Sequence, residues 1–80
     1  MPARMILSKY ERVQLVASRA EQLLHGASPL VDDVGDDIIK IAETEVDRRV
    51  LPVRVARHLP NGKVAIYALD QFVHTAGRPT

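Results

Sequence analysis

Apolar residues recur at spacings of three and four along residues 8–24, and this period indicates an amphipathic helix. Ser8 and Glu11 have the spacing of a capping box, which marks the start of this helix. His25 and Gly26 mark its end, because glycine adopts the left-handed conformation after a last turn at little cost. The predicted apolar face consists of Tyr10, Val13, Val16, Ala17, Ala20, Leu23 and Leu24. Its small alanines would let another element pack closely against it.

A second helix is predicted after an acidic loop that spans residues 26–35. Asp36 or Asp37 is expected to cap a helix over residues 38–49, since a short acidic side chain can accept the unpaired amides of the first turn. Its apolar stripe is narrow and consists of Ile38, Ile41, Ala42, Glu45 and Val46, with Glu45 near the edge. We expect this stripe to pack against the first helix.

From residue 50 onward the period changes to two, which indicates β-strands. Residues 51–57 and 63–68 flank the sequence Leu-Pro-Asn-Gly at 59–62, and this arrangement predicts an antiparallel hairpin. Pro52 lacks a backbone N–H, so it should open its strand or lie on an edge. Arg57 shares a strand face with apolar residues, and its charge therefore needs a carboxylate or carbonyl partner in this chain or in another.

The remaining segments are short. Asp70 and Gln71 are predicted to turn the chain before a possible short third strand at residues 72–74. Residues 1–7 are predicted to form a flexible or extended N-terminal strap, and residues 75–80 a frayed tail. The sequence thus predicts a single α+β domain over residues 8–74, with two packed amphipathic helices followed by an antiparallel β hairpin, and with flexible termini.

The composition favours dependence on a partner. A core built from 80 residues usually supplies only about 3–5 kcal/mol of net stability. Small domains commonly add disulfides, a metal or a partner, and the absence of cysteine excludes disulfides and a thiolate zinc site. No apolar run approaches the length of a membrane span or of a secretory signal, so a soluble protein is expected.

No set of residues has the spacing of a catalytic or metal site. Four aspartates within residues 32–37 form adjacent pairs at 32–33 and 36–37, whereas a calcium loop needs acids at alternating positions. A solvated loop with a helix cap is favoured over a cation site by about five to one. His25, His58 and His74 are scattered, and no nucleophile motif is present. We therefore expect neither a cofactor nor a metal, and no enzymatic activity from this chain by itself.

Basic residues gather in one third of the chain, as Arg48, Arg49, Arg54, Arg57 and Lys63. A basic ribbon can read a nucleic-acid groove, which suggests a small dimeric DNA-binding regulator that uses the hairpin. Eleven Lys and Arg against ten Asp and Glu leave a net charge of only +1, so no overall field attracts nucleic acid. A solvated surface is favoured over a groove-reading surface by about two to one.

Short motifs from Leu7 to Val73 together resemble one protein family. They are, in order, KYER, SRA, SPLVD, an acidic residue before IIKIAETE, LPVRVAR and LPNG. Their order and spacing resemble the omega-type small subunit of cellular RNA polymerases. The hairpin favours the branch that contains the archaeal subunit K and the eukaryotic sixth common subunit over bacterial omega. The chain departs from the family at Ile38, where members have proline, at Ala56, the first position of an arginine pair, and at Asn61, where members have aspartate.

This resemblance implies a noncatalytic subunit of a multisubunit DNA-directed RNA polymerase. The resemblance implies that the chain docks on the largest subunit near the base of the mobile clamp and promotes assembly. Contact with DNA and RNA is then expected only indirectly, through the complex. Neither membrane binding nor a homo-oligomer is expected. The chain lacks the acidic N-terminal extension of eukaryotic members, which favours the cytoplasm of an archaeal cell, a viral factory or a virion, with the nucleus expected for a eukaryotic source. The residues that match the motifs, and that are expected at the interface although some must serve the core, are Lys9, Tyr10, Glu11, Arg12, Arg19, Ala20, Pro52, Arg57, Leu59, Pro60 and Gly62.

Overall fold

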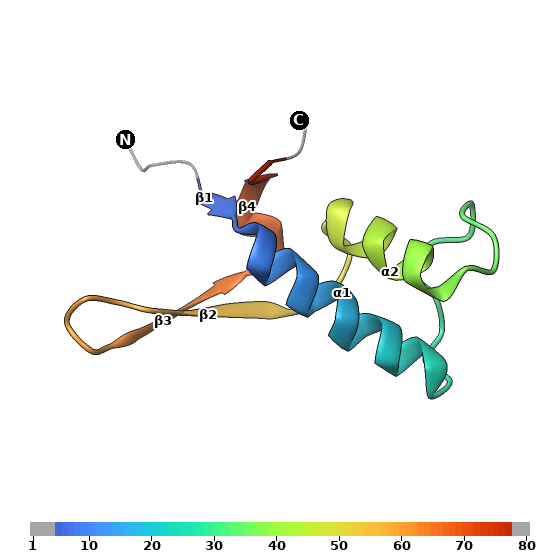
Figure 1. The fold of residues 1–80 in the computed structure, drawn as a ribbon, viewed down its shortest axis with the longest axis horizontal. Coiled ribbons are helices and arrows are strands. Elements are labelled where there is room, and N and C mark those ends of the chain that lie inside the picture. The colour runs from blue at the N-terminus through green and yellow to red at the C-terminus, as the bar shows by residue number, and fades with distance from the viewer. Residues whose placement is uncertain (1–4, 78–80) are drawn as a thin grey trace.

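The computed structural model describes residues 5–77, and these form an α+β domain (Figure 1). Its elements are β1 (Met5–Leu7), α1 (Lys9–Leu24), α2 (Ile38–Asp47), β2 (Arg54–His58), β3 (Val64–Ala68), the 3₁₀ helix η1 (Leu69–Gln71) and β4 (Phe72–Thr75). The predicted α+β class, the two helices and the hairpin are confirmed. The predicted order is confirmed only in part, because a strand also precedes the first helix. Neither helix is long and apolar enough to cross a membrane, within the part of the chain that the structure describes.

Both helices begin at the caps that the sequence indicates. In the capping box of α1, the Glu11 N–H donates to Ser8 Oγ at 3.0 Å, and the Ser8 N–H donates to the Glu11 carboxylate at 2.9 Å. Asp37 caps α2, where its Oδ1 accepts the N–H of Ile39 at 3.0 Å and that of Lys40 at 3.3 Å. These acceptors satisfy amides that a first turn leaves unpaired, so the local sequence fixes where each helix starts.

The C-terminal end of α2 differs from the prediction, since the helix stops at Asp47 rather than at Arg49. Arg49 has a φ of 60°, in the left-handed region that usually requires glycine. The following Val50 N–H donates to the Glu45 carbonyl at 3.2 Å, and the Arg49 N–H donates to the Val46 carbonyl at 3.1 Å. This pair of bonds is a Schellman motif, which caps the carbonyl end of the helix.

The side chain of Arg49 ties this helix end to β4. Its Nε donates to the Phe72 carbonyl and its Nη2 to Thr75 Oγ1, both at 3.0 Å. Its Nη1 donates to the Val46 carbonyl of the same helix at 2.8 Å. Burial lowers the pKa of Arg49 from its ordinary value, which reflects the cost of placing a guanidinium here. The left-handed backbone is therefore accompanied by three side-chain hydrogen bonds.

The hairpin pairs β2 with β3 in antiparallel register, from Arg54 opposite Ala68 to His58 opposite Val64. Gly62 has a φ of 83° in the turn, as the Leu-Pro-Asn-Gly sequence predicts. Pro52 lies just before β2 and so takes no part in the ladder.

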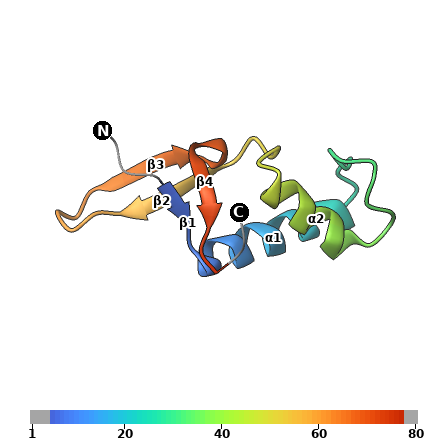
Figure 2. The same cartoon turned by 90° about the horizontal axis from the view of Figure 1, so that it is seen from above.

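A second small sheet joins the two ends of the described chain, because β1 pairs with β4 in parallel (Figure 2). Leu7 is fully buried, and its carbonyl accepts the Ala76 N–H at 2.8 Å. Residues 5–7 of the predicted strap are thus an extended strand, while residues 1–4 of it lie outside the described residues. Thr75 is buried as the last residue of β4, so the strand runs one residue into the segment predicted to fray.

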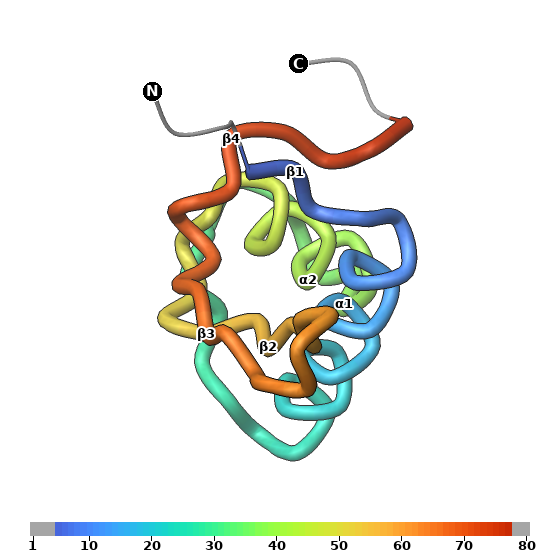
Figure 3. The backbone as a smooth tube through the Cα atoms, turned by 90° about the vertical axis from the view of Figure 1, so that its left-hand side faces the viewer, coloured from blue at the N-terminus to red at the C-terminus, as the bar shows by residue number. Residues whose placement is uncertain are grey.

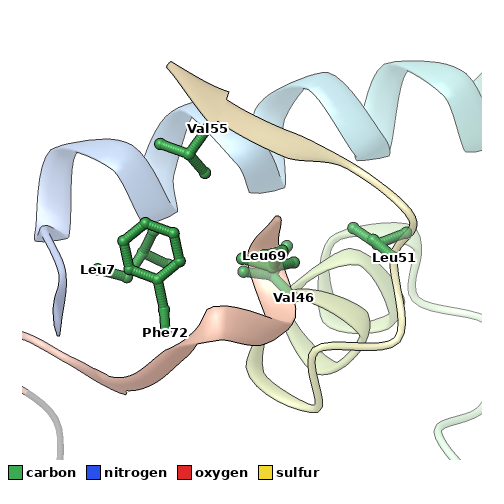
Figure 4. Close-up of a cluster of buried hydrophobic side chains, with 6 residues drawn as sticks. All are labelled: Leu7, Val46, Leu51, Val55, Leu69 and Phe72. Atoms are coloured by element: carbon green, nitrogen blue, oxygen red, sulfur yellow. The ribbon is translucent and has the colours of Figure 1, made fainter. Parts of the chain in front are cut away.

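The apolar core consists of two clusters. The larger cluster lies where β1, β2, β4 and the end of α2 meet, and its buried members are Leu7, Val46, Leu51, Val55, Leu69 and Phe72 (Figure 4). The smaller cluster lies between the helices and consists of Ala20, Leu23, Ile41 and Ala42. The predicted packing of the two helices is therefore confirmed. The hairpin extends toward one end of the molecule, away from α2 (Figure 1), and a view from that end shows it in front of the helices (Figure 3).

The conformation of Arg49 leads to a prediction for stability. Arg49→Ala should destabilise the domain by about 1.5–3 kcal/mol, because it removes charge-assisted hydrogen bonds and keeps the left-handed backbone. Arg49→Gly loses the same bonds but relieves about 1 kcal/mol of backbone strain. Urea denaturation of the isolated chain should therefore rank the parent above Arg49→Gly and Arg49→Gly above Arg49→Ala. Equal midpoints for the two variants would show that residue 49 is not left-handed in solution.

Candidate partner-docking surface

Arg19 and Glu45 form a buried ion pair between α1 and α2. The Glu45 side chain has no exposed surface, and Arg19 is also buried. Arg19 Nε and Nη2 bind the two carboxylate oxygens at 2.5 and 3.3 Å. The same carboxylate accepts the Leu30 N–H at 2.6 Å, and Arg19 Nη2 also donates to the Ser28 carbonyl at 2.9 Å. The pair therefore joins the two helices and the loop between them, and Glu45 does not lie at the edge of its stripe as predicted.

The pKa of Glu45 is lowered by these contacts. Burial by itself raises the pKa of this carboxyl, because a charge is less stable away from water. The hydrogen bonds from Arg19 and from the Leu30 amide lower the pKa by more, so the folded state favours the ionised form. The ion pair is thus kept charged at neutral pH.

Arg12 makes the second link between the helices. Its Nε and Nη2 donate to the two carboxylate oxygens of Asp47 at 2.9 and 3.0 Å, and Glu43 lies 3.7 Å from Nη2. This bidentate geometry favours the charged form, and the Asp47 hydrogen bond raises the pKa of Arg12. Because Arg12 and Arg19 are seven residues apart, they share one face of α1, and that spacing could have indicated their common role.

Arg57 connects the hairpin to the start of α1. Its Nε and Nη2 bind the Glu11 carboxylate at 3.0 and 2.8 Å, and Nη2 also donates to the Ile6 carbonyl at 2.6 Å. The guanidinium lies 4.8 Å from the centroid of the Phe72 ring, within the range of a cation–π contact. The Arg57 hydrogen bond lowers the pKa of Glu11 by more than burial raises it. The carboxylate and carbonyl partners predicted for Arg57 are therefore confirmed, and both lie in this chain.

The motif residues expected at the interface divide into two groups. Those whose side chains are engaged or buried within the domain are Glu11, Arg12, Arg19, Ala20 and Arg57. The residues that are exposed are Lys9, Tyr10, Pro52, Leu59, Pro60 and Gly62. The inward group holds the fold together, and the outward group remains accessible to another molecule.

The apolar face of α1 also divides into two parts. Val16, Ala20 and Leu23 contact the core, as predicted. Four residues predicted on the same face are exposed instead, and we call them the α1 stripe: Tyr10, Val13, Ala17 and Leu24. In this stripe Tyr10 is 70% exposed, Val13 60% and Leu24 68%. The prediction failed here because α2 and the strands cover only one side of α1, and the buried side also carries Arg12, Leu15 and Arg19.

The predicted basic cluster is dispersed in the structure. Arg48 binds the Asp33 carboxylate with two hydrogen bonds of 2.9 and 2.8 Å, whereas Arg49 and Arg57 make the internal contacts described above. Only Arg54 and Lys63 of this cluster have neither a carboxylate nor a carbonyl partner for their side chains among residues 5–77. The histidines and acids of the described chain form no group of three that could hold a metal ion.

A family model described as RNA polymerase Rpb6 matches residues 4–53. With the capped α1 and the paired motif arginines, this match confirms the resemblance to the omega-type small subunits of RNA polymerases. Within that class, the chain belongs to the RNA polymerase Rpb6 family.

Individual relatives agree with this assignment. The DNA-directed RNA polymerase subunit Rpo6 of Sulfurisphaera tokodaii is 46% identical over 68 residues, which cover 81% of this chain and 79% of that protein. The Rpo6 subunit of Aeropyrum pernix is 41% identical over 73 residues, with coverages of 88% and 82%. A Caenorhabditis elegans protein, named probable DNA-directed RNA polymerases I, II, and III subunit RPABC2, is 36% identical over 67 residues, with coverages of 82% and 49%.

The buried ion pair leads to a double-mutant prediction. Glu45→Leu should destabilise the domain by about 3–5 kcal/mol, because it leaves the Arg19 charge buried without its partner. The double variant Arg19→Leu with Glu45→Leu should recover a large part of that loss, since no unpaired charge remains. Chemical denaturation of all four combinations measures the coupling. Additive losses would contradict a direct interaction between the two charges.

The lowered pKa values of Glu11 and Glu45 predict acid sensitivity. Because each folded-state pKa lies below the ordinary value of 4.5, the ion pairs contribute fully above that value. Their contribution is lost as pH falls below 4.5 and through the lowered folded pKa values. Urea midpoints measured across this range should fall with pH, and Glu11→Gln should make the fall shallower. A midpoint that rises on acidification would contradict the direction of both shifts.

Proposed function

We propose that this chain is a noncatalytic subunit of a DNA-directed RNA polymerase that docks on the largest subunit near the base of the clamp and stabilises the assembled enzyme. Family membership and the printed names of the Rpo6 relatives support the polymerase assignment. The observation that carries the docking role is the α1 stripe, an apolar surface that the domain leaves uncovered on the helix with the K-Y-E-R motif.

The α1 stripe has the properties of a protein-binding surface. Full burial of one Val or Leu side chain contributes about 1.5–3 kcal/mol. Tyrosine and other aromatic residues are enriched at such interfaces, because they bring a large apolar area with a polar end. The internal ion pairs hold α1 in place, so the partner meets a preformed helix and little ordering cost is added on binding.

Four of the remaining exposed motif residues lie at the hairpin, and we propose that they form a second contact with the partner. Pro52, Leu59, Pro60 and Gly62 lie at the base and the turn of the hairpin, and Lys9 starts α1. Two separate contacts would clip distant parts of a large partner together, which stabilises the assembled state. We propose this clip as the physical basis of assembly, at the cellular site where the polymerase works: the cytoplasm of an archaeal cell, a viral factory or a virion, or the nucleus for a eukaryotic source.

The alternative of a DNA-binding regulator loses its main support. It requires the basic residues to form one surface, whereas Arg48, Arg49 and Arg57 are occupied by partners within the domain. We therefore propose that this chain contacts nucleic acid only indirectly, as part of the assembled polymerase.

The α1 stripe predicts a separation between assembly and catalysis. Val13→Glu combined with Leu24→Glu should lower the fraction of polymerase that assembles, because two charges would be buried against an apolar partner. The elongation rate of each assembled complex should change much less, since the stripe holds subunits together and takes no part in the reaction. Reconstitution of the polymerase, with assembled fraction and rate per active complex measured separately, tests both statements.

Ser18→Glu is the matched control, because Ser18 is exposed on α1 but lies outside the stripe. It should assemble as the parent does. All three proteins should also melt at similar temperatures when isolated, since the changed residues are exposed. Normal assembly with a slowed rate for the stripe variant would refute the proposed clip.

A further inference from the structure

The strand β2 presents an open edge on the side away from β3. In the hairpin ladder, the Leu59 N–H donates to the Lys63 carbonyl and the Leu69 N–H donates to the Val53 carbonyl. Bonded pairs alternate with non-bonded pairs along an antiparallel ladder, so Val55 and Arg57 point their backbone groups at β3. The backbone N–H and C=O groups of the remaining β2 residues point away from β3, and these residues are Arg54, Ala56 and His58.

This edge faces α1 across a groove. Figure 3 shows β2 lying between β3 and α1. One hollow of about 290 Å³ and another of about 590 Å³ lie here, and both are lined by Glu11 and Gln14 of α1 and by Ala56 of β2. The hollows share these three residues, so they form one continuous groove, which we call the α1–β2 groove. It runs beside the whole of β2, from Arg54 to His58.

The open edge is the kind of surface that takes an added strand. A two-stranded ribbon is only marginally stable, and an unpaired edge is a template for pairing with another chain. No backbone hydrogen bond involves the outward groups of Arg54, Ala56 or His58 within residues 5–77. On the opposite edge, in contrast, the outward N–H of Ala68 already donates to the Gln71 side chain at 2.8 Å.

We propose that the α1–β2 groove binds an extended segment of the polymerase core, which pairs with β2 as a third strand of the hairpin sheet. This inference rests on the proposed function and adds to it the conformation of the bound partner. Each outward residue of β2 offers an N–H and a C=O, so up to about six main-chain hydrogen bonds can form. The added strand need be only as long as β2, which has five residues.

The side chains of β2 indicate the chemistry of this segment. Arg54 and His58 flank the small Ala56 on one face of the strand, and the structure gives neither of the two a carboxylate partner among the described residues. Cross-strand neighbours pair by charge and by size. The partner segment should therefore carry an acidic side chain opposite Arg54, a hydrogen-bond acceptor opposite His58, and a larger apolar side chain opposite Ala56.

An ester at a single backbone position tests the added strand directly. In a chemically synthesised chain, replacing the Ala56 amide with an ester removes an outward N–H and leaves the side chain unchanged. Binding to the polymerase core that lacks this subunit should weaken by up to about tenfold, as expected for the loss of one hydrogen bond. The matched control is the same replacement at Ile66, which lies directly opposite Ala56 and points its N–H to the other edge. Each ester also weakens one carbonyl acceptor within the β2–β3 ladder. The two isolated ester variants should therefore have similar melting temperatures.

Hydrogen exchange gives a second readout on the unmodified chain. The amides of Arg54, Ala56 and His58 should exchange fast in the free protein and slowly in the complex, whereas those of Val64 and Ile66 should remain fast. One outcome would refute the added strand but leave the docking role intact. In that outcome the parent docks, the two esters bind equally well, and the β2 amides still exchange fast in the complex. If the parent does not dock at all, the proposed function fails together with this inference.

Discussion

The buried carboxylate of Glu45 constrains the whole helical half of the domain. An ionised group without access to water is tolerated only when charge and hydrogen bonds surround it, and here they come from Arg19 and from the Leu30 amide. These donors lie on α1 and on the interhelical loop. The helices must therefore approach closely, which the small residues Ala20 and Ala42 permit. The geometry of the pair thus fixes the distance between α1 and α2 and the path of the loop.

The distribution of side chains on α1 departs in part from the usual assignment of polar and apolar faces, although Val16, Ala20 and Leu23 still contact the core. Its arginines point inward to carboxylates, whereas the α1 stripe points to solvent. A small domain buries little apolar surface and is only marginally stable, so specific ion pairs help to hold its shape while part of the apolar area of α1 stays exposed. The family motif K-Y-E-R reflects both demands, because Glu11 and Arg12 serve the fold and Lys9 and Tyr10 remain accessible.

Local features of the fold could be predicted from the sequence, and long-range ones could not. The capping box at Ser8, the cap at Asp37 and the turn at Gly62 depend on neighbouring residues, and all three were predicted correctly. The parallel pairing of β1 with β4 depends on segments at opposite ends of the chain, and no periodicity within three or four residues reveals it. For the candidate site, helical period identified apolar positions but not the side that other elements cover. The sequence therefore merged the core face of α1 with the exposed stripe.

The parallel pairing of β1 with β4 also orders the folding of the chain in time. The contacts of α1 with α2 and of β2 with β3 join segments that are close in sequence, so they can form early. Met5 pairs with Phe72, and Leu7 lies in the same core as Leu69 and Phe72. During synthesis the first strand must wait, with its apolar side chains unpaired, until the last strand has emerged. The larger core cluster therefore closes last, and it is the part of this domain most exposed to misassociation before folding is complete.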